Sequence, residues 1–176
     1  RKQLIFTNKA KPKLRILKVD ATTGQPLKNA EFRVTKVEDK TVNEYITDEK
    51  GEILIENLDE AIYKAEEFMP PDGYDLYTES KEIALEWGKT KTLKFDNIRK
   101  PVLVFLKSNG LTGKPVKGAT FKVEYETSNG GVKNIGTFKT DENGQIIIPK
   151  VNAGWYILTE TMPAIGYSLP KNPVTR

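Results

Sequence analysis

The sequence contains one pattern twice, and this internal repeat limits the fold more than any other feature of its 176 residues. In the first half of the pattern, matching residues are 89 positions apart, as Lys18 is from Lys107. In the second half they are 93 positions apart, as Gly73 is from Gly166. The second copy therefore has four additional residues, and Ser-Asn-Gly-Gly at 128–131 predicts that they lengthen a hairpin loop. The repeat predicts two similar domains in tandem.

Both copies consist of short segments in which apolar and polar residues alternate. Residues 14–19 and 32–37 alternate in this way, which is typical of strands with one buried face. Turn sequences at 47–51 and 140–144 each lead into a further apolar segment. Residues 80–86 could be helical, but their length favours a strand or a single turn. The sequence therefore predicts an all-β protein made of two antiparallel β-sandwiches.

The repeat also predicts where each domain begins and ends. Leu93-Lys94-Phe95-Asp96-Asn97 comes just before the second copy, and Leu4-Ile5-Phe6-Thr7-Asn8 stands 89 positions earlier. We therefore interpret residues 1–10 as the closing strand of a preceding repeat. Residues 11–99 are then the first domain, and residues 100–176 are a second domain that lacks its final strand.

The composition excludes several classes of function. The chain has no Cys and no His, so it has no disulfide, no thiolate metal site and no imidazole base. A net charge of +4 without a basic cluster argues against a nucleic-acid partner. No apolar segment is long enough for membrane insertion, and no secretory signal is present. These two absences exclude little, because the first ten residues are interpreted as part of a larger protein. We expect no cofactor, no metal and no catalytic turnover.

Three kinds of polar residue occupy positions where the alternation predicts a buried side chain. Lys18, Glu67 and Asn97 do so in the first copy, and Lys107 and Glu160 do so in the second. A single buried charge is costly unless it is paired or neutralised. We therefore expect these inward polar groups to lie together within each domain.

A buried lysine, glutamate and asparagine can react with one another. Burial disfavours the charged forms of an amine and of a carboxyl group, so both can be neutral. A neutral amine is a nucleophile, and a protonated carboxyl group can polarise the carboxamide carbonyl and carry protons to the leaving group. The product is a Lys–Asn isopeptide bond, formed with loss of ammonia.

The motifs resemble those of Cna B-type domains, also called SpaA-like or prealbumin-like domains, which are found in Gram-positive surface adhesins and pilins. The second copy is similar to the family's E-box region, and the first copy has a looser version of it. The residues that carry the resemblance are Tyr156-Ile157-Leu158-Thr159-Glu160-Thr161 with Pro163 and Gly166-Tyr167, and Tyr63 to Phe68 with Pro71 and Gly73-Tyr74. The resemblance implies two Ig-like, prealbumin-like β-sandwiches in series.

The resemblance also implies an autocatalytic isopeptide bond between the first and last strands. By position, Lys18 would be joined to Asn97 and Glu67 would be the catalyst. Glu66 and Asp96 are rivals by adjacency, but strand parity turns both outward. The alternative to a bond is an ordinary buried ion pair.

In the second copy, Lys107 and Glu160 match the family pattern, but the acceptor is missing. Asn8 occupies the acceptor position of an upstream unit. Either Lys107 and Glu160 form a non-covalent pair, or Lys107 captures Asn8 of a neighbouring copy by strand addition through residues 1–10. Residues 169–173 resemble a sortase signal, but the rest of that signal is missing, so we predict an edge strand there.

The resemblance implies a structural stalk in a secreted, cell-wall-attached adhesin or pilus subunit, with neighbouring repeats as partners. The alternative is an adhesive module that binds a host protein or glycan directly. A glycosidase is the weakest hypothesis, because no two inward acids are predicted to face each other.

Overall fold

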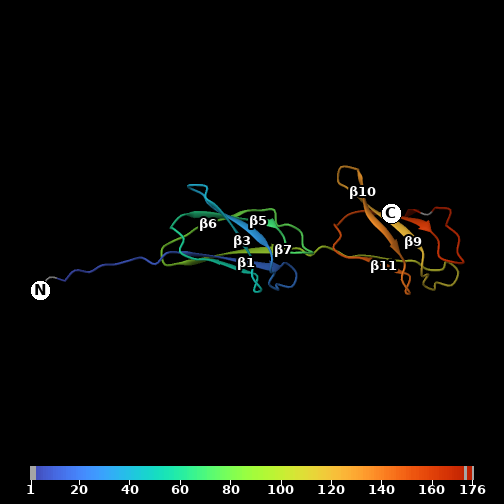
Figure 1. Ribbon diagram of the computed structural model, residues 1–176, viewed down its shortest axis with the longest axis horizontal. Helices are drawn as coiled ribbons and strands as arrows, with labels where there is room; N and C mark the ends of the chain where they lie inside the picture. Colours follow the sequence, from blue (N-terminus) through green and yellow to red (C-terminus); the bar gives the residue numbers. More distant parts are fainter. Residues whose placement is uncertain (1–2, 173, 176) are drawn as a thin grey trace. The chain divides into compact units, whose positions relative to one another are not determined.

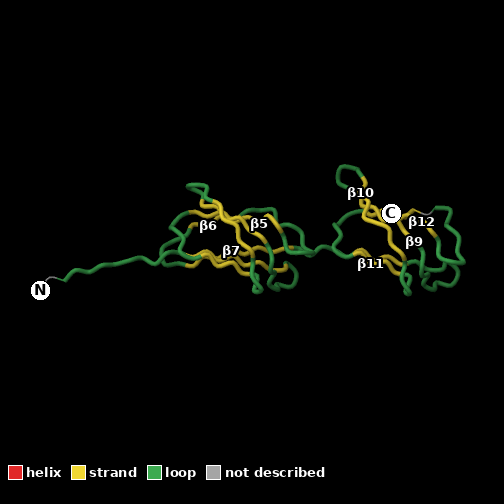
Figure 2. Tube along the Cα trace, in the orientation of Figure 1, coloured by secondary structure: helices red, strands yellow, loops and turns green. Residues whose placement is uncertain are grey.

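The structure is a computed structural model that describes residues 3–172, 174 and 175. The chain divides into two compact units, residues 1–99 and 100–176, and each is built of strands (Figures 1 and 2). Unit 1 contains β1 (Lys13–Asp20), β2 (Glu31–Lys36), β3 (Val42–Ile46), β4 (Glu52–Ile55), β5 (Ile62–Met69), β6 (Lys81–Ala84) and β7 (Thr90–Asn97). Unit 2 contains β8 (Leu103–Leu106), β9 (Thr120–Glu126), β10 (Val132–Lys139), β11 (Gln145–Ile148), β12 (Tyr156–Met162) and β13 (Val174–Thr175).

Unit 1 is a sandwich of two sheets. One sheet has the strand order β4-β1-β7, and the other has the order β3-β2-β5-β6. The core between them consists of apolar side chains from both sheets, among them Leu14, Ile16, Phe32, Leu93 and Phe95. The prediction of an all-β sandwich is therefore confirmed, and residues 80–86 contain strand β6 as expected.

The pairing of β1 with β7 departs from the predicted antiparallel arrangement. These two strands are parallel and paired along their whole length, from Lys13 opposite Thr90 to Asp20 opposite Asn97. The other strand pairs of the described residues are antiparallel. Parallel neighbours need a long crossover. Here the crossover is the rest of unit 1, so the first and last strands of the unit lie side by side.

Unit 2 has the same two layers, with fewer strands in one of them. Its larger sheet has the order β10-β9-β12-β13, and its smaller sheet contains β8 and β11. Among the described residues, β8 pairs with β11 only, so its second edge is open, whereas β1 of unit 1 has neighbours on both edges. The side chains of Leu103 and Phe105 on β8 are only partly buried, while Leu14 and Ile16 on β1 are fully buried.

The four additional residues of unit 2 lengthen strands, so the prediction of a longer hairpin loop is wrong. The loop between β2 and β3 and the loop between β9 and β10 each span five residues, 37–41 and 127–131. Strand β10 is instead longer than β3, with a bulge between Asn134 and Gly136. Extra residues that add ladder hydrogen bonds extend a hairpin without changing its turn.

Residues 3–10 form no strand in the structure (Figure 2). Leu4, Ile5 and Phe6 are 83%, 77% and 91% exposed. Their interpretation as the closing strand of another unit stays a prediction. At the other end, the prediction of an edge strand at 169–173 is wrong for residues 169–172, which are loop, and residue 173 lies outside the described residues. The edge strand next to β12 is β13, which begins only at Val174.

Candidate functional site

Lys18, Glu67 and Asn97 lie together in the core of unit 1. Each is on a different strand, and alternation along β1, β5 and β7 turns all three inward. Their exposed fractions are 0%, 5% and 1%. Lys18 is the largest fully buried side chain of the described residues.

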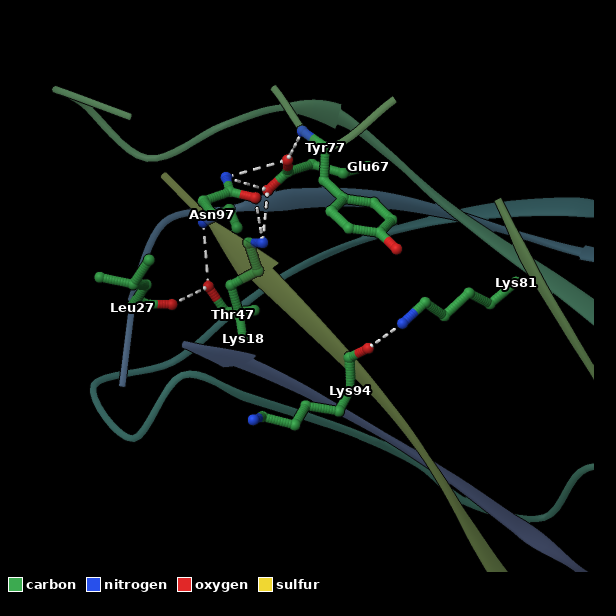
Figure 3. A network of polar contacts seen from close by, with 9 residues as sticks. Lys18, Leu27, Thr47, Glu67, Tyr77, Lys81, Lys94 and Asn97 are labelled. Atoms are coloured by element: carbon green, nitrogen blue, oxygen red, sulfur yellow. Dashed lines mark hydrogen bonds and ion pairs between the residues drawn. The ribbon is translucent and has the colours of Figure 1, made fainter. Parts of the chain in front are cut away.

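The three side chains point toward one another (Figure 3). The Lys18 amine donates a hydrogen bond to Oδ1 of Asn97. The Asn97 Nδ2 donates to both carboxyl oxygens of Glu67, at 3.0 Å each. The distance from the Lys18 Nζ to the Glu67 Oε1 is 3.5 Å. Glu67 is therefore in reach of the amine on one side and of the amide nitrogen on the other.

Tyr77 completes the surroundings of this site, and sequence reasoning missed it. Its backbone N–H donates to the Glu67 Oε2 at 2.8 Å. Its ring lies 5.7 Å from the Lys18 Nζ and packs edge-on against Phe95 at 5.3 Å. Tyr77 is in a loop after Gly73-Tyr74, where no strand alternation could have placed it.

Burial changes the proton affinity of Lys18. Removal from water lowers the pKa of Lys18 from 10.5 to about 8, although the charge and hydrogen bond of Glu67 raise it. A lysine with a pKa near 8 has an appreciable neutral fraction at neutral pH. The neutral amine is the form that can attack a carbonyl carbon.

The two rival acids lie outside this cluster. Glu66 forms an ion pair with Lys64 at 3.0 Å, and Asp96 forms one with Lys94 at 3.2 Å. The side chains of Glu66 and Asp96 are 38% and 45% exposed. This is the arrangement that strand parity predicts.

The backbone of Lys18 is held by a close turn. The Lys18 N–H donates to the Gly51 carbonyl at 2.8 Å, and the Lys18 carbonyl accepts from Leu27 N–H at 2.9 Å. Gly51 has a φ of +66°, and a Cβ there would lie 2.4 Å from the Lys18 carbonyl oxygen. Glycine is therefore required for β1 to pass this close to the turn.

Buried Thr47 ties this turn to the segment that connects β1 with β2, a role that sequence reasoning also missed. Its hydroxyl donates to the Leu27 carbonyl at 2.8 Å and accepts from the Ala30 N–H at 2.9 Å. Thr140 makes the matching pair of bonds in unit 2. The repeated Thr-Asp pattern could have revealed this threonine, since both copies keep it.

A second polar network holds the end of β1 beside Asn97. Asp20 is paired with Asn97 across the sheet and is 2% exposed. Hydrogen bonds from the Thr23 and Thr22 N–H groups and from the Tyr74 hydroxyl hold the pKa of Asp20 well below its ordinary value. Arg99 donates to the Tyr74 hydroxyl at 2.8 Å. These bonds fix the ends of β1 and β7 near Asn97.

In unit 2, Lys107 and Glu160 form an ion pair with a distance of 2.8 Å between Nζ and Oε2. The Glu160 side chain is 3% exposed, but that of Lys107 is 26% exposed. No Asn side chain of the described residues forms a hydrogen bond with either group. Asn8 lies in the exposed segment 3–10, and the structure does not bring it to either site.

Unit 2 also lacks the counterpart of Tyr77. The matching position, 93 residues later, is Pro170, which has no N–H and so cannot donate to Glu160. Pro170 therefore cannot supply to Glu160 the backbone hydrogen bond that Tyr77 supplies to Glu67.

Neither a metal site nor a membrane-spanning helix occurs in the part of the chain that the structure describes. The described residues contain no group of three His, Cys, Asp or Glu side chains that could hold a metal ion. They also contain no helix that is long and apolar enough to cross a membrane.

Several solved structures have a similar fold. The Bacillus anthracis TIE protein is 27% identical, covers 92% of this chain and has a TM-score of 0.50. A streptococcal ancillary pilin is 23% identical, covers 92% of this chain and has a TM-score of 0.52. The chain spans 30% and 56% of the lengths of these two proteins.

The shaft pilin SpaA from Lactobacillus rhamnosus GG is 16% identical. The alignment covers 96% of this chain and 94% of the pilin, with a TM-score of 0.60. No curated protein sequence matches the chain.

The family model of the SpaA prealbumin-like fold domain matches the chain twice, at residues 12–99 and 102–175. The two matches cover nearly the whole chain, one in each unit. The chain therefore belongs to the family of SpaA prealbumin-like fold domains.

Proposed function

We propose that the chain is a structural stalk segment of a bacterial surface protein or pilus, and that an isopeptide bond between Lys18 and Asn97 stabilises its first unit. The observation that carries the proposal is the buried contact of the Lys18 amine with the Asn97 carboxamide, next to the Glu67 carboxyl group. The carbonyl carbon of Asn97 is one bond, about 1.2 Å, from the oxygen that the amine contacts.

The reaction needs no external reagent. The neutral Lys18 Nζ attacks the Asn97 Cγ, and the new C–N bond replaces the bond from Cγ to Nδ2. Glu67 takes a proton from the amine and gives one to Nδ2, which leaves as ammonia. Both Glu67 carboxyl oxygens accept hydrogen bonds from the Asn97 Nδ2. The main role of Glu67 would therefore be protonation of the leaving nitrogen rather than polarisation of the Asn97 carbonyl. The bond forms once, so the chain is not a turnover enzyme.

The bond has a mechanical consequence. It would join β1 to β7, the first and last strands of the unit, close to the point where the chain leaves it. Pulling force would then pass through the side-chain link instead of the hydrogen bonds between these strands. By analogy with a disulfide that closes a long loop, the link would also stabilise the unit by roughly 4 kcal/mol. A chain without Cys can thus be stable outside the cell.

Family membership and the pilin folds support a location on the surface of a Gram-positive cell, with the chain attached to the cell wall. The partners of a stalk segment are the neighbouring repeats and subunits of the same assembly. Two sandwiches in series are suited to this role, because each unit has its own core.

The mass of the intact, denatured chain tests the bond. We expect the parent protein to be about 17 Da lighter than its sequence, which is the loss of one ammonia. Lys18→Arg, Asn97→Ala and Glu67→Gln should each have the full mass of their own sequences. Peptide mapping should find residues 18 and 97 in one branched peptide.

Two matched variants serve as controls. Glu66→Gln and Asp96→Asn change the same chemical groups one residue away, on the outward face, and should keep the deficit. A full-length mass for the parent chain would mean that Lys18 and Glu67 are only a buried ion pair, and the bond would be ruled out.

A further inference from the structure

The two units differ in the side chains at the end of β2 and at the start of β5. In unit 1, Lys36 on β2 lies opposite Tyr63 on β5. In unit 2 the matching residues are Tyr125 on β9 and Tyr156 on β12, and they also lie opposite each other. A lysine in unit 1 therefore stands where unit 2 has an aromatic ring, at the same register of the same fold.

In unit 2 this place is closed by packed rings. The ring centroids of Tyr125 and Tyr156 are 5.2 Å apart, and the Tyr125 hydroxyl donates to the Ala153 carbonyl at 3.2 Å. Gly154 leaves room for the Tyr125 ring, because a Cβ there would lie 2.8 Å from it. The matching residue of unit 1 is Ala61, which carries the Cβ that this packing excludes.

In unit 1 the same place is a cavity of about 270 Å³. Val34, Leu58 and Tyr63 form its apolar and aromatic part, and Lys36, Tyr45 and Asp59 are among its polar lining residues. We call it the Lys36 cavity. Its volume is just below the roughly 300 Å³ at which pockets for small molecules begin, so it has room for one small ring.

The polar groups of the Lys36 cavity are specific to unit 1. Tyr45 corresponds to Phe138, which lacks the hydroxyl, and Asp59 corresponds to Asn152, which lacks the charge. The strand register confirms the first match, because Tyr45 and Phe138 lie opposite equivalent phenylalanines of β2 and β9. The lysine, the hydroxyl and the carboxylate thus occur together in unit 1 and are all replaced in unit 2.

The charges around the Lys36 cavity cancel. The Lys36 Nζ lies 3.3 Å from the Asp59 Oδ2 and 3.5 Å from the Asp39 Oδ2, and the Lys11 Nζ lies 3.1 Å from the Asp59 Oδ1. Two cations therefore face two carboxylates. A site without net charge attracts neither anions nor cations, so its ligand should be neutral.

Hydrogen-bonding capacity remains in the Lys36 cavity. The Tyr45 hydroxyl forms no hydrogen bond with the described residues. Partial removal from water raises the pKa of Tyr45, so this hydroxyl keeps its proton and can donate. Each carboxylate has about four lone-pair sites and the lysine has three N–H donors, so Asp59 and Lys36 can bind further groups.

We propose that the Lys36 cavity binds one neutral sugar ring of a glycan. A sugar ring has apolar C–H groups for the apolar and aromatic part of the cavity. Its hydroxyl groups both donate and accept, as bonds to Lys36, Tyr45 and Asp59 require. Unit 1 would then be an adhesive domain as well as a structural one. This site lies apart from Lys18 and does not depend on the isopeptide bond.

Titration of the intact chain, followed by heteronuclear NMR, tests this inference. The probes are four neutral sugars, glucose, galactose, mannose and N-acetylglucosamine, each up to about 50 mM, because a single ring should bind with a Kd of about 1 mM. We expect at least one of them to cause saturable shifts at residues 34–45 and 58–63. The absence of such shifts with all four would overturn the proposal.

Two charged sugars test the argument from charge. Glucosamine is a cation and N-acetylneuraminic acid is an anion at neutral pH, and both should shift these signals less than the best neutral sugar does. Tighter binding of either one would show that the Lys36 cavity does not select a neutral ligand.

Variants based on unit 2 test the location. The double variant Lys36→Tyr, Ala61→Gly should rebuild the packing of unit 2, keep the Tm and abolish the shifts. Tyr45→Phe should weaken binding by about five- to tenfold, since it removes one hydrogen bond. Thr35→Ser is the control, because alternation turns residue 35 away from the cavity, and it should bind like the parent.

Unchanged binding by the folded double variant would show that the sugar binds elsewhere. The mass deficit of the parent chain is measured separately. Failure of sugar binding therefore leaves the Lys18–Asn97 bond untouched, and a full-length mass leaves the sugar site untouched.

Discussion

At the scale of single residues, the most unusual feature of unit 1 is a lysine with no exposure to solvent. Lys18 is retained in the core by the carboxamide of Asn97 and the carboxyl group of Glu67. A buried amine of this kind is costly while it remains charged. Conversion of the amine to an amide removes the charge and with it this free-energy cost. The proposed bond would therefore stabilise the site in which it forms.

The pKa of Lys18 predicts how stability depends on pH when the bond is blocked. In Asn97→Ala, Lys18 stays an amine, and its pKa is near 10.5 in the unfolded chain. In the folded parent, burial lowers the pKa of Lys18 to about 8, and we expect the same direction in the variant. Between these values the unfolded state binds more protons, so the free energy of unfolding rises with pH. We expect the Tm of this variant to increase from pH 8 to pH 10.5 in thermal scans followed by circular dichroism.

The control for this prediction is the double variant Asn97→Ala, Lys18→Met. Every other titrating group is the same in both proteins, so the difference between their Tm profiles belongs to Lys18. Parallel profiles across this pH range would show that the folded pKa of Lys18 is not lowered.

At the scale of elements, the strands of each unit are positioned by short turns that come very close to the first strand. In both units, a Cβ added at the glycine of the Thr-Asp turn would lie 2.4 Å from a lysine carbonyl oxygen: that of Lys18 for Gly51, and that of Lys107 for Gly144. The turn therefore determines where the lysine backbone lies.

Gly51→Ala should destabilise unit 1 by roughly 3 kcal/mol or more, since the left-handed backbone is strained and the turn must also move away from β1. Gly88→Ala is the matched control. Its φ of +70° imposes similar backbone strain, but its Cβ would contact nothing within 4 Å. We expect that control to cost only about 1–2 kcal/mol. Urea unfolding measures both, and equal costs would mean that the approach to β1 does not limit the turn.

At the scale of the whole molecule, two units in series suit a role in transmitting force. A load applied along the chain would enter unit 1 at β1 and leave it at β7, and these two strands are parallel neighbours. Without a covalent link, pulling would shear the hydrogen bonds between them. With the link, the residues between positions 18 and 97 cannot extend.

Single-molecule pulling on the intact chain should reveal this difference. Lys18 and Asn97 are 79 positions apart, so their unfolding without a bond releases roughly 260–280 Å of chain, less the folded separation. We expect Lys18→Arg to show that step, and the parent chain and Asp96→Asn to lack it. A step of this size in the parent would contradict the stalk mechanism.

Much of this description could be predicted from the sequence. The repeat revealed two similar units, and alternation identified the strands and the inward positions of Lys18, Glu67 and Asn97. Alternation is informative because successive side chains of a strand point to opposite faces. When one face is buried, apolar residues therefore occur at every second position.

Other features depended on the tertiary structure, because alternation specifies a face but not a neighbour. Nothing local in β1 and β7 indicates that they pair in parallel, since their contact spans the whole unit. Tyr77 is in a loop, where no period applies, and its contact with Glu67 arises only when the loop folds over the site. The sequence by itself determined which residues face the core of this protein. Only the folded chain decided which of them touch, because those contacts join strands that are far apart in the sequence.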